Sequence, residues 1–308
     1  MFAASPESLP EQVRDACAWV AARAGSVRIQ AEEIPAYAAA LPAPPDPILD
    51  LPGANRETRG AFAICLNAIN FGSGWWPTIR KRPGHSGFFT IAAGLAERFR
   101  EIGAWSSGEL RSLTAAELAP TFGQDPGHPL MEQFAASLND VGGHLETDHG
   151  GRFEAAVDSA GGSAPALAGL LSGWNAFADV STYEGRRVPF FKRAQLAAAD
   201  VNRAGVADLS GLDRLTAFAD NLVPHVLRLD GILRLDPELT AAIEAGDLLP
   251  HGSPPEVELR ACAVQAVELL AAARPELTAA EIDATLWNRG RERRYKSLAR
   301  PRSRNTAY

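Results

Sequence analysis

The chain has 308 residues, enough to bury a large core, and its 46% apolar, 22% charged and 7% aromatic residues favour a helical globular protein. The formal net charge of −7 argues against a general nucleic-acid binder, because binding to a polyanion depends on a basic surface. No apolar run reaches the length of a membrane span and no export leader is visible at the start, so neither is expected.

The three cysteines, Cys17, Cys65 and Cys262, have no C-x-x-C spacing and lie in apolar helical contexts. They predict buried free thiols in a reducing compartment, and therefore a cytoplasmic protein.

The first part of the chain predicts helices at 5–24 and 27–41, the second with a proline near its start. The prolines of residues 42–53 then predict an extended connector. Because only about 40 residues precede this connector, we interpret it as a strap across one domain that spans residues 1–308.

A helix is expected over 56–70 and should end at FGSGWWP, where two glycines stand beside two tryptophans. Such a loop commonly shapes a pocket, although Phe71, Trp75 and Trp76 could equally fill a corner of the core. Residues 81–86 predict a turn, or a short hairpin near 79–90, before a helix that begins near Gly87.

Helical patterns follow at 109–122, 129–153 and 163–180. Thr114 and Glu117 form an S/T-x-x-E capping box in the first, and two glycines interrupt the second. The sequence HLETDH, from His144 to His149, suggests a metal site. The two histidines are five residues apart, whereas two metal ligands on one face of a helix lie three or four residues apart. A polar surface turn is therefore the preferred interpretation.

The stretch from Val188 to Leu233 is unusual because it places charged and amide side chains in apolar helical patterns. Within 215–233 the apolar residues have helical spacing, and Asp220 lies off their stripe. Pro224 would kink or end this helix and could aim the Asp220 carboxylate into a cleft. Periodicity alone favours a simpler interpretation, in which solvated helix faces are joined by a turn.

Two further helices are expected at 256–273 and 278–294, and Thr278 with Glu281 would cap the second. The basic run over 289–304 could be a nucleic-acid arm, a solvated tail or a local phosphate grip. The acidic remainder of the chain favours the last two.

Several of these segments form an ordered set of motifs. The set comprises LNAINFGSGWWP, GHSGFFTIAAGLAERF, GRRVPFFKRAQLAAAD, LTAFADNLVPHVLRLDGIL, PEVELRACAVQAVELL, IDATLW and PRSRNTAY. In content and order it resembles the queuosine salvage proteins, the queuosine 5'-phosphate N-glycosylase/hydrolase family, over nearly the whole chain.

This resemblance implies an all-helical fold related to the helical DNA glycosylases. It also implies cleavage of the N-glycosidic bond of queuosine 5'-monophosphate, which releases queuine for reuse in transfer RNA modification together with ribose 5-phosphate. Such a reaction develops positive charge at C1' of the sugar. It therefore needs a carboxylate beneath the sugar, a pocket for the base and cations for the phosphate.

By resemblance, Asp220 carries the carboxylate role, as nucleophile or electrostatic stabiliser, and Phe218 lines the base or sugar pocket. Asp283 and Trp287 would face the base, where a carboxylate suits the secondary amine of queuine. The other expected contacts are the phosphate-binding cations Lys192 and Arg193, the weaker candidate Arg304, and a wall for the flat base made by Asn70, Phe71 and Trp76.

Each assignment has an alternative. Lys192 or Arg193 could pair with Asp179 or Asp200, and Asp200 could itself be the catalytic acid. Asp283 could be an ordinary acid in the first turn of a helix. The acid that often follows Leu-Trp in the family is Asn288 here, so a second carboxylate for the base would come from Glu292 or elsewhere.

No phosphate-binding glycine loop, Ser/His/Asp signature or Cys/His zinc spacing is present in the sequence, so we expect neither a cofactor nor a metal. The expected partner is a small molecule, without a membrane and without stable nucleic-acid binding. Two other functions stay open: a glycosylase acting on nucleic acid, which would need a basic groove, and a non-catalytic queuine carrier, which would tolerate Asn in place of Asp220.

Overall fold

The computed structural model describes residues 8–45, 51 and 53–308 of the chain. Within these ranges it contains fifteen α-helices and two antiparallel sheets of two short strands each, so the expected helical fold is confirmed. Residues 5–7 of the first expected helix, and residues 46–50 and 52 of the expected connector, lie outside the described residues. None of the helices described is both long and apolar enough to cross a membrane.

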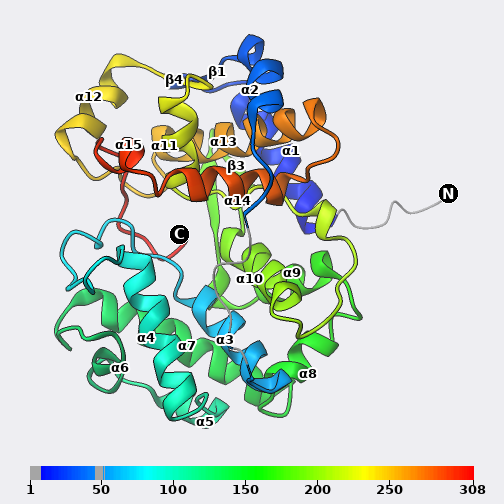
Figure 1. Cartoon of the computed structure of the whole chain (residues 1–308), viewed down its shortest axis with the longest axis vertical. Coiled ribbons are helices and arrows are strands. Elements are labelled where there is room, and N and C mark those ends of the chain that lie inside the picture. Colours follow the sequence, from blue (N-terminus) through cyan, green and yellow to red (C-terminus); the bar gives the residue numbers. More distant parts are fainter. Residues whose placement is uncertain (1–7, 46–50, 52) are drawn as a thin grey trace.

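One group of elements surrounds α13 (Pro254–Ala273), in which every residue from Glu256 to Val264 is buried. A helix buried on all sides forms the centre of a core, and Figure 1 shows this group in the upper half of the molecule. The other helices of the α13 group are α1 (Leu9–Ala21), α2 (Ile34–Ala40), α11 (Leu222–Leu229), α12 (Pro237–Ala245), α14 (Ala279–Arg289) and α15 (Arg293–Lys296). Strand β1 (Val27–Ile29) pairs antiparallel with β4 (Leu233–Leu235) beside them, and a 3-10 turn, η1 (Ala31–Glu33), leads into α2.

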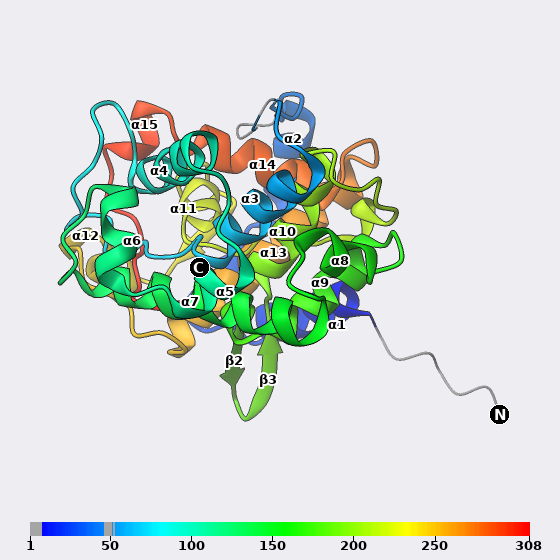
Figure 2. The same ribbon diagram turned by 90° about the horizontal axis from the view of Figure 1, so that it is seen from below.

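The second group fills the lower half of Figure 1 and packs around α3, α7 and α10. Its helices are α3 (Arg56–Ala68), α4 (Gly87–Glu101), α5 (Ser107–Ser112), α6 (Ala115–Phe122), α7 (Pro129–Asp148), α8 (Phe153–Asp158), α9 (Ala164–Ser172) and α10 (Lys192–Arg203). A hairpin of β2 (Val180–Tyr183) and β3 (Arg186–Pro189) projects from the body, as Figure 2 shows. Two 3-10 turns, η2 (Asn175–Phe177) and η3 (Leu212–Arg214), complete the elements.

Several expected boundaries differ from the structure. Residues 27–29 form a strand instead of a helix, because their backbone pairs with β4. The short hairpin is β2–β3, whereas residues 81–86 make turns that lead into α4. The capping box of Thr114 and Glu117 is present, but it starts a separate helix, α6.

The two glycines at 142 and 143 do not interrupt α7, which runs on to Asp148. A side chain on Gly142 would meet the backbone of α5, 2.5 Å from Arg111 N and 2.6 Å from Ser107 O. Gly142 therefore serves the close packing of two helices and not a break in one.

The helix expected from residue 215 begins only at Leu222. Before it, side chains from other helices bind the backbone groups that a helix would use: Asp283 accepts from Phe218 N, and Arg260 donates to Ala219 O. Pro224 then lies in the first turn of α11, where its missing N–H costs no helical hydrogen bond, so it causes no kink.

Candidate active site

A cavity of about 530 Å³ lies where the two groups of helices meet. Its size is within the range of roughly 300–1,000 Å³ that is usual for small-molecule sites. Its walls come from α3, the start of α4, α10, α14, the loops at 70–76 and 218–222, and the tail beyond residue 289. In Figure 1 the red tail descends from α15 towards the cyan loop that joins α3 to α4.

Two carboxyl groups, those of Asp220 and Asp283, line the cavity and are almost fully buried, with exposures of 8% and 4%. Asp220 Oδ1 accepts the N–H groups of Leu222 (2.7 Å) and Val223 (3.0 Å), as an acid does at the start of a helix. Asp283 Oδ1 accepts Phe218 N–H (3.0 Å). Both acids are thus bound to the same loop, at 218–223, and the fold fixes them together.

Burial raises the pKa of Asp283 well above its usual range, and the nearby Asp220 carboxylate raises it further. Lys192 lines the same cavity, and burial lowers its pKa to about 8, although the negative charge of Asp220 opposes this shift. Lys192 Nζ donates to Asn70 O (3.0 Å). A carboxyl group with a raised pKa and a lysine therefore accompany Asp220 in the cavity.

Aromatic rings form another wall of the cavity, and Trp287 lies at its centre. The rings of Phe88 and Trp287 pack edge to face, with ring centres 5.7 Å apart and ring planes at 83°. The centre of the Phe89 ring lies 5.9 Å from that of Trp287. The guanidinium of Arg291 lies over the Phe89 ring, 4.7 Å from the ring centre. Phe71, Trp76 and Phe218 also line the cavity. These surfaces suit a flat heterocycle.

Among the described residues that line the cavity, cationic side chains outnumber carboxyl groups, although the chain as a whole is acidic. The cations are Lys81, Lys192, Arg203, Arg291, Lys296, Arg300 and Arg302, and the acids are Asp200, Asp220 and Asp283. Burial and the charges of Arg300 and Arg302 lower the pKa of Lys81, and burial and the charge of Arg302 lower the pKa of Arg300, so these three cations repel one another. Ser73 also lines the cavity, and its buried hydroxyl has no hydrogen-bond partner in the part of the chain that the structure describes. Such a set is suited to an anion.

Arg193 and Arg304, two of the expected phosphate contacts, are not among the residues that line the cavity. Arg193 is 1% exposed and donates to Ala68 O and to Ala307 O (3.2 Å). Because adjacent residues of a helix point about 100° apart, Lys192 faces the cavity and Arg193 faces the core. Arg304 is exposed. The other expected residues, Asn70, Phe71, Trp76, Phe218 and Trp287 with the two acids, do come together there.

The alternative acids have other partners. Asp200 lines the cavity but accepts from Asn67 Nδ2 (2.8 Å) and pairs with Arg203 (3.0 Å). Asp179 pairs with Arg260 (2.7 Å), a partner that the sequence did not suggest. Glu292 is exposed and does not line the cavity.

Some lining residues were not predicted from the sequence, namely Lys81, Phe88, Phe89, Ser73 and Tyr308, and Arg300 and Arg302 were not singled out. The sequence does carry a signal for the two arginines, because they belong to the basic run over 289–304, for which a local phosphate grip is one interpretation.

Among the described residues, no group of three or more His, Cys, Asp and Glu side chains could hold a metal ion. In the HLETDH segment, the imidazole of His144 stacks on Trp174, with ring centres 5.0 Å apart and an angle of 4°. Its Nδ1 lies 3.2 Å from Asp148 Oδ2. This geometry is that of a packed surface helix.

Comparison with known proteins gives consistent matches. The model of the family described as "Queuosine salvage protein" matches residues 51–308. A protein of Sphaerobacter thermophilus is 33% identical over 266 residues, 82% of each chain. A mouse protein is 31% identical over 54% of each chain, and a bovine one 30% identical over 68% of this chain and 67% of its own. All three are named queuosine 5'-phosphate N-glycosylase/hydrolase.

Proposed function

This chain belongs to the queuosine salvage protein family, and on that premise we propose that it hydrolyses the N-glycosidic bond of queuosine 5'-phosphate. The products would be queuine and ribose 5-phosphate. The observation that carries the proposal is the buried carboxylate of Asp220 in a cavity that has an aromatic wall and an excess of cations.

The proposed chemistry assigns different roles to the two buried acids. The bond between C1' and the base breaks, and its electron pair goes to the base, while Asp220 faces the positive charge that develops at C1'. Asp283, whose pKa is raised by burial, lies at the base in our proposal and acts as the acid that gives its proton to the leaving group. Water supplies the hydroxyl that adds to C1', and its remaining proton returns to Asp283.

We place the base between Trp287, Phe218 and Trp76, and beside the backbone turn at Asn70 and Phe71. All five residues line the cavity. Stacking of the flat base on indole and phenyl rings would supply binding that does not depend on charge. Lys192, next to Asp220, would hold the sugar or phosphate end of the nucleotide.

For the phosphate itself we propose Arg300, Arg302 and Lys81 in place of Arg193 and Arg304. Repulsion among three cations is relieved when a phosphate binds between them, and the unpartnered hydroxyl of Ser73 offers a further donor. Guanidinium groups bind phosphate oxygens in pairs, which favours the two arginines as the main contacts.

We also propose that one domain carries the reaction and that it takes place in the cytoplasm without stable nucleic-acid binding. The three cysteines are free and buried, which suits a reducing compartment. The net charge of −7 disfavours a duplex, whereas a local excess of cations serves one nucleotide.

The test is to incubate the purified protein with queuosine 5'-phosphate, with the nucleoside queuosine and with guanosine 5'-phosphate, and to follow free base by chromatography with mass detection. We expect release of queuine from the first substrate, and loss of that release in Asp220→Ala. A wild-type protein that binds queuine and releases none from the nucleotide would overturn the proposal in favour of a carrier.

A further inference from the structure

We propose that the buried ion pair of Asp179 and Arg260 is a positioning device that sets the distance between Lys192 and the carboxylate of Asp220. This inference rests on the proposed function of the same cavity. Neither Asp179 nor Arg260 lines the cavity, so the pair makes no contact with a substrate that binds there.

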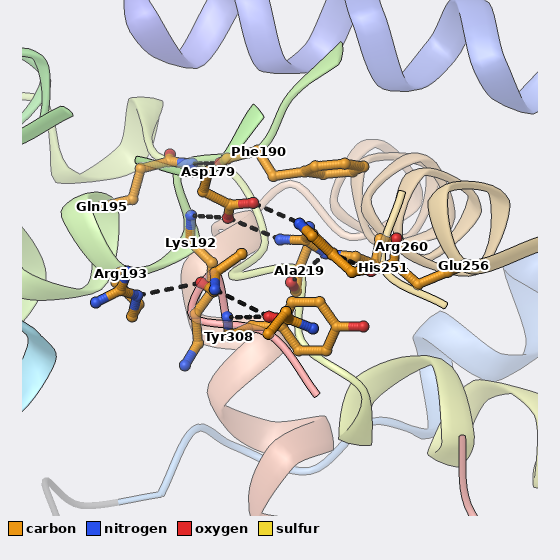
Figure 3. Close-up of polar contacts among 12 residues, drawn as sticks. Asp179, Phe190, Lys192, Arg193, Gln195, Ala219, His251, Glu256, Arg260 and Tyr308 are labelled. Atoms are coloured by element: carbon orange, nitrogen blue, oxygen red, sulfur yellow. Dashed lines mark hydrogen bonds and ion pairs between the residues drawn. The ribbon is translucent and has the colours of Figure 1, made fainter. Parts of the chain in front are cut away.

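The pair is a two-pronged contact in the core. Arg260 NH1 donates to Asp179 Oδ1 (2.9 Å) and Arg260 NH2 to Asp179 Oδ2 (2.7 Å), with side-chain exposures of 1% and 0%. Figure 3 shows the two groups facing each other, with the ring of Phe190 beside them. The guanidinium lies 3.9 Å from the centre of the Phe190 ring and 4.3 Å from that of Tyr308. Rings on these two sides and a carboxylate at the edge leave the guanidinium little freedom to move.

From the acid side, the pair holds the start of α10. Asp179 Oδ2 also accepts Lys192 N–H (3.0 Å), the first backbone donor of that helix. The preceding residue, Phe191, is in the left-handed region (φ 48°) and gives α10 no side-chain cap of its own. Asp179, although 13 residues earlier in the chain, therefore caps α10 and fixes the position of the Lys192 backbone.

From the arginine side, the pair holds the loop that carries the carboxylate. Arg260 Nε donates to Ala219 O (3.0 Å), the carbonyl of the peptide that joins Ala219 to Asp220. On the other side of that peptide, Asp220 Oδ1 caps α11. One ion pair thus connects the backbones of Lys192 and Asp220, which come from different groups of helices, and a shift in the pair changes their separation.

The test compares two arginines that make the same kind of contact. Arg56 also donates to a carboxylate with both terminal nitrogens, to Asp158, and through Nε to a backbone carbonyl, Val206 O (2.6 Å), but at the surface and outside the cavity. Lysine keeps the charge in either place and loses the planar fork. We expect R260K to lower kcat for queuine release about 100-fold with KM changed less than about threefold, because a misplacement of about 1 Å costs that much. R56K should leave both values unchanged.

A double variant separates positioning from stability. D179N together with R260Q removes both charges of the pair, so its melting temperature should lie closer to that of the wild type than the melting temperature of either single variant does, while kcat stays low. Recovery of kcat together with the melting temperature, or a wild-type kcat in R260K, would overturn the inference.

A crystal structure of R260K tests the positioning role without any measurement of activity. We expect the peptide between Ala219 and Asp220 to move relative to Lys192. An unchanged separation refutes the positioning role even if the wild-type protein proves inactive. Absence of queuine release from both wild type and R56K would instead refute the proposed function.

Discussion

The two ends of the cavity are built differently. The carboxylate end, formed by Asp220, Asp283 and Lys192, is almost fully buried, and each of its side chains makes a hydrogen bond to the protein backbone. The basic rim, formed by Lys81, Arg300 and Arg302, is partly open to solvent, and its charges repel one another. Electrostatic interactions are stronger where water is excluded. Changes at the carboxylate end should therefore act mainly on kcat, and changes at the rim mainly on KM.

The largest expected effect concerns Asp220. Asp220→Asn should lower kcat on the order of 10³-fold, because it removes the charge that faces C1' from a dry site. Asp200→Asn is the matched control, since Asp200 lines the same cavity and pairs with Arg203. Initial rates of queuine release measure both. A large loss in the Asp200 variant and a small one in the Asp220 variant would exchange their roles.

A substitution of Asp283 tests the proposed proton transfer to the leaving base at the same end of the cavity. Asp283→Asn keeps the shape and a hydrogen-bond donor but cannot transfer a proton, so kcat should fall about 10²-fold. Because the carboxyl is buried and its pKa is raised, the neutral amide should fold as stably as the acid. Thermal unfolding measured beside the kinetics checks this. A wild-type kcat in Asp283→Asn would mean that the side chain only binds the base.

The basic rim is tested by charge removal. Arg300→Gln and Arg302→Gln should each raise KM for queuosine 5'-phosphate roughly 10- to 100-fold, the usual cost of a lost hydrogen bond to a charged group. The KM for the nucleoside should not change, because it has no phosphate. Arg293→Gln, in the same basic run but exposed and outside the cavity, is the control. Equal losses for nucleotide and nucleoside would contradict the assignment.

The smallest expected effect is a pH dependence that comes from Lys192. Its side chain is charged below a pKa of about 8, so kcat/KM should fall as pH rises through that value, by about tenfold at pH 9. In Lys192→Arg the fall should move beyond the measurable range, because a guanidinium keeps its charge. The charges of Asp220, Arg193, Asp283 and Asp179 all act on Lys192. If the fall comes from Lys192 itself, it must persist in Asp283→Asn. Its disappearance there would assign it to the carboxyl group.

Local signals in the sequence predicted the helical class and many helix starts. Thr278 and Glu281 form the capping box that begins α14, as their spacing indicated. The loop at 215–220 could not be predicted in this way, since its backbone partners, Asp283 and Arg260, come from helices far along the chain. Apolar residues with helical spacing there are buried in an irregular loop instead.

The same limit applied to the candidate site. Lys192 and Arg193 are adjacent and chemically alike, and only the rotation of α10 decides which of them meets the cavity. Arg300 and Arg302 become site residues because the tail crosses the loop after α3, where Gly74 N–H donates to Ser303 O. Tertiary contacts of this kind leave no local pattern in a single sequence.

The aromatic wall gives the molecule an optical reporter of its own. Of the six tryptophans in the chain, Trp76 and Trp287 line the cavity, whereas Trp105 and Trp174 are buried elsewhere. A base stacked on an indole changes its emission, so occupancy of the cavity can be followed in unlabelled protein. Because this signal requires no turnover, it measures ligand binding in variants that have lost the reaction. It therefore distinguishes a loss of binding from a loss of bond cleavage.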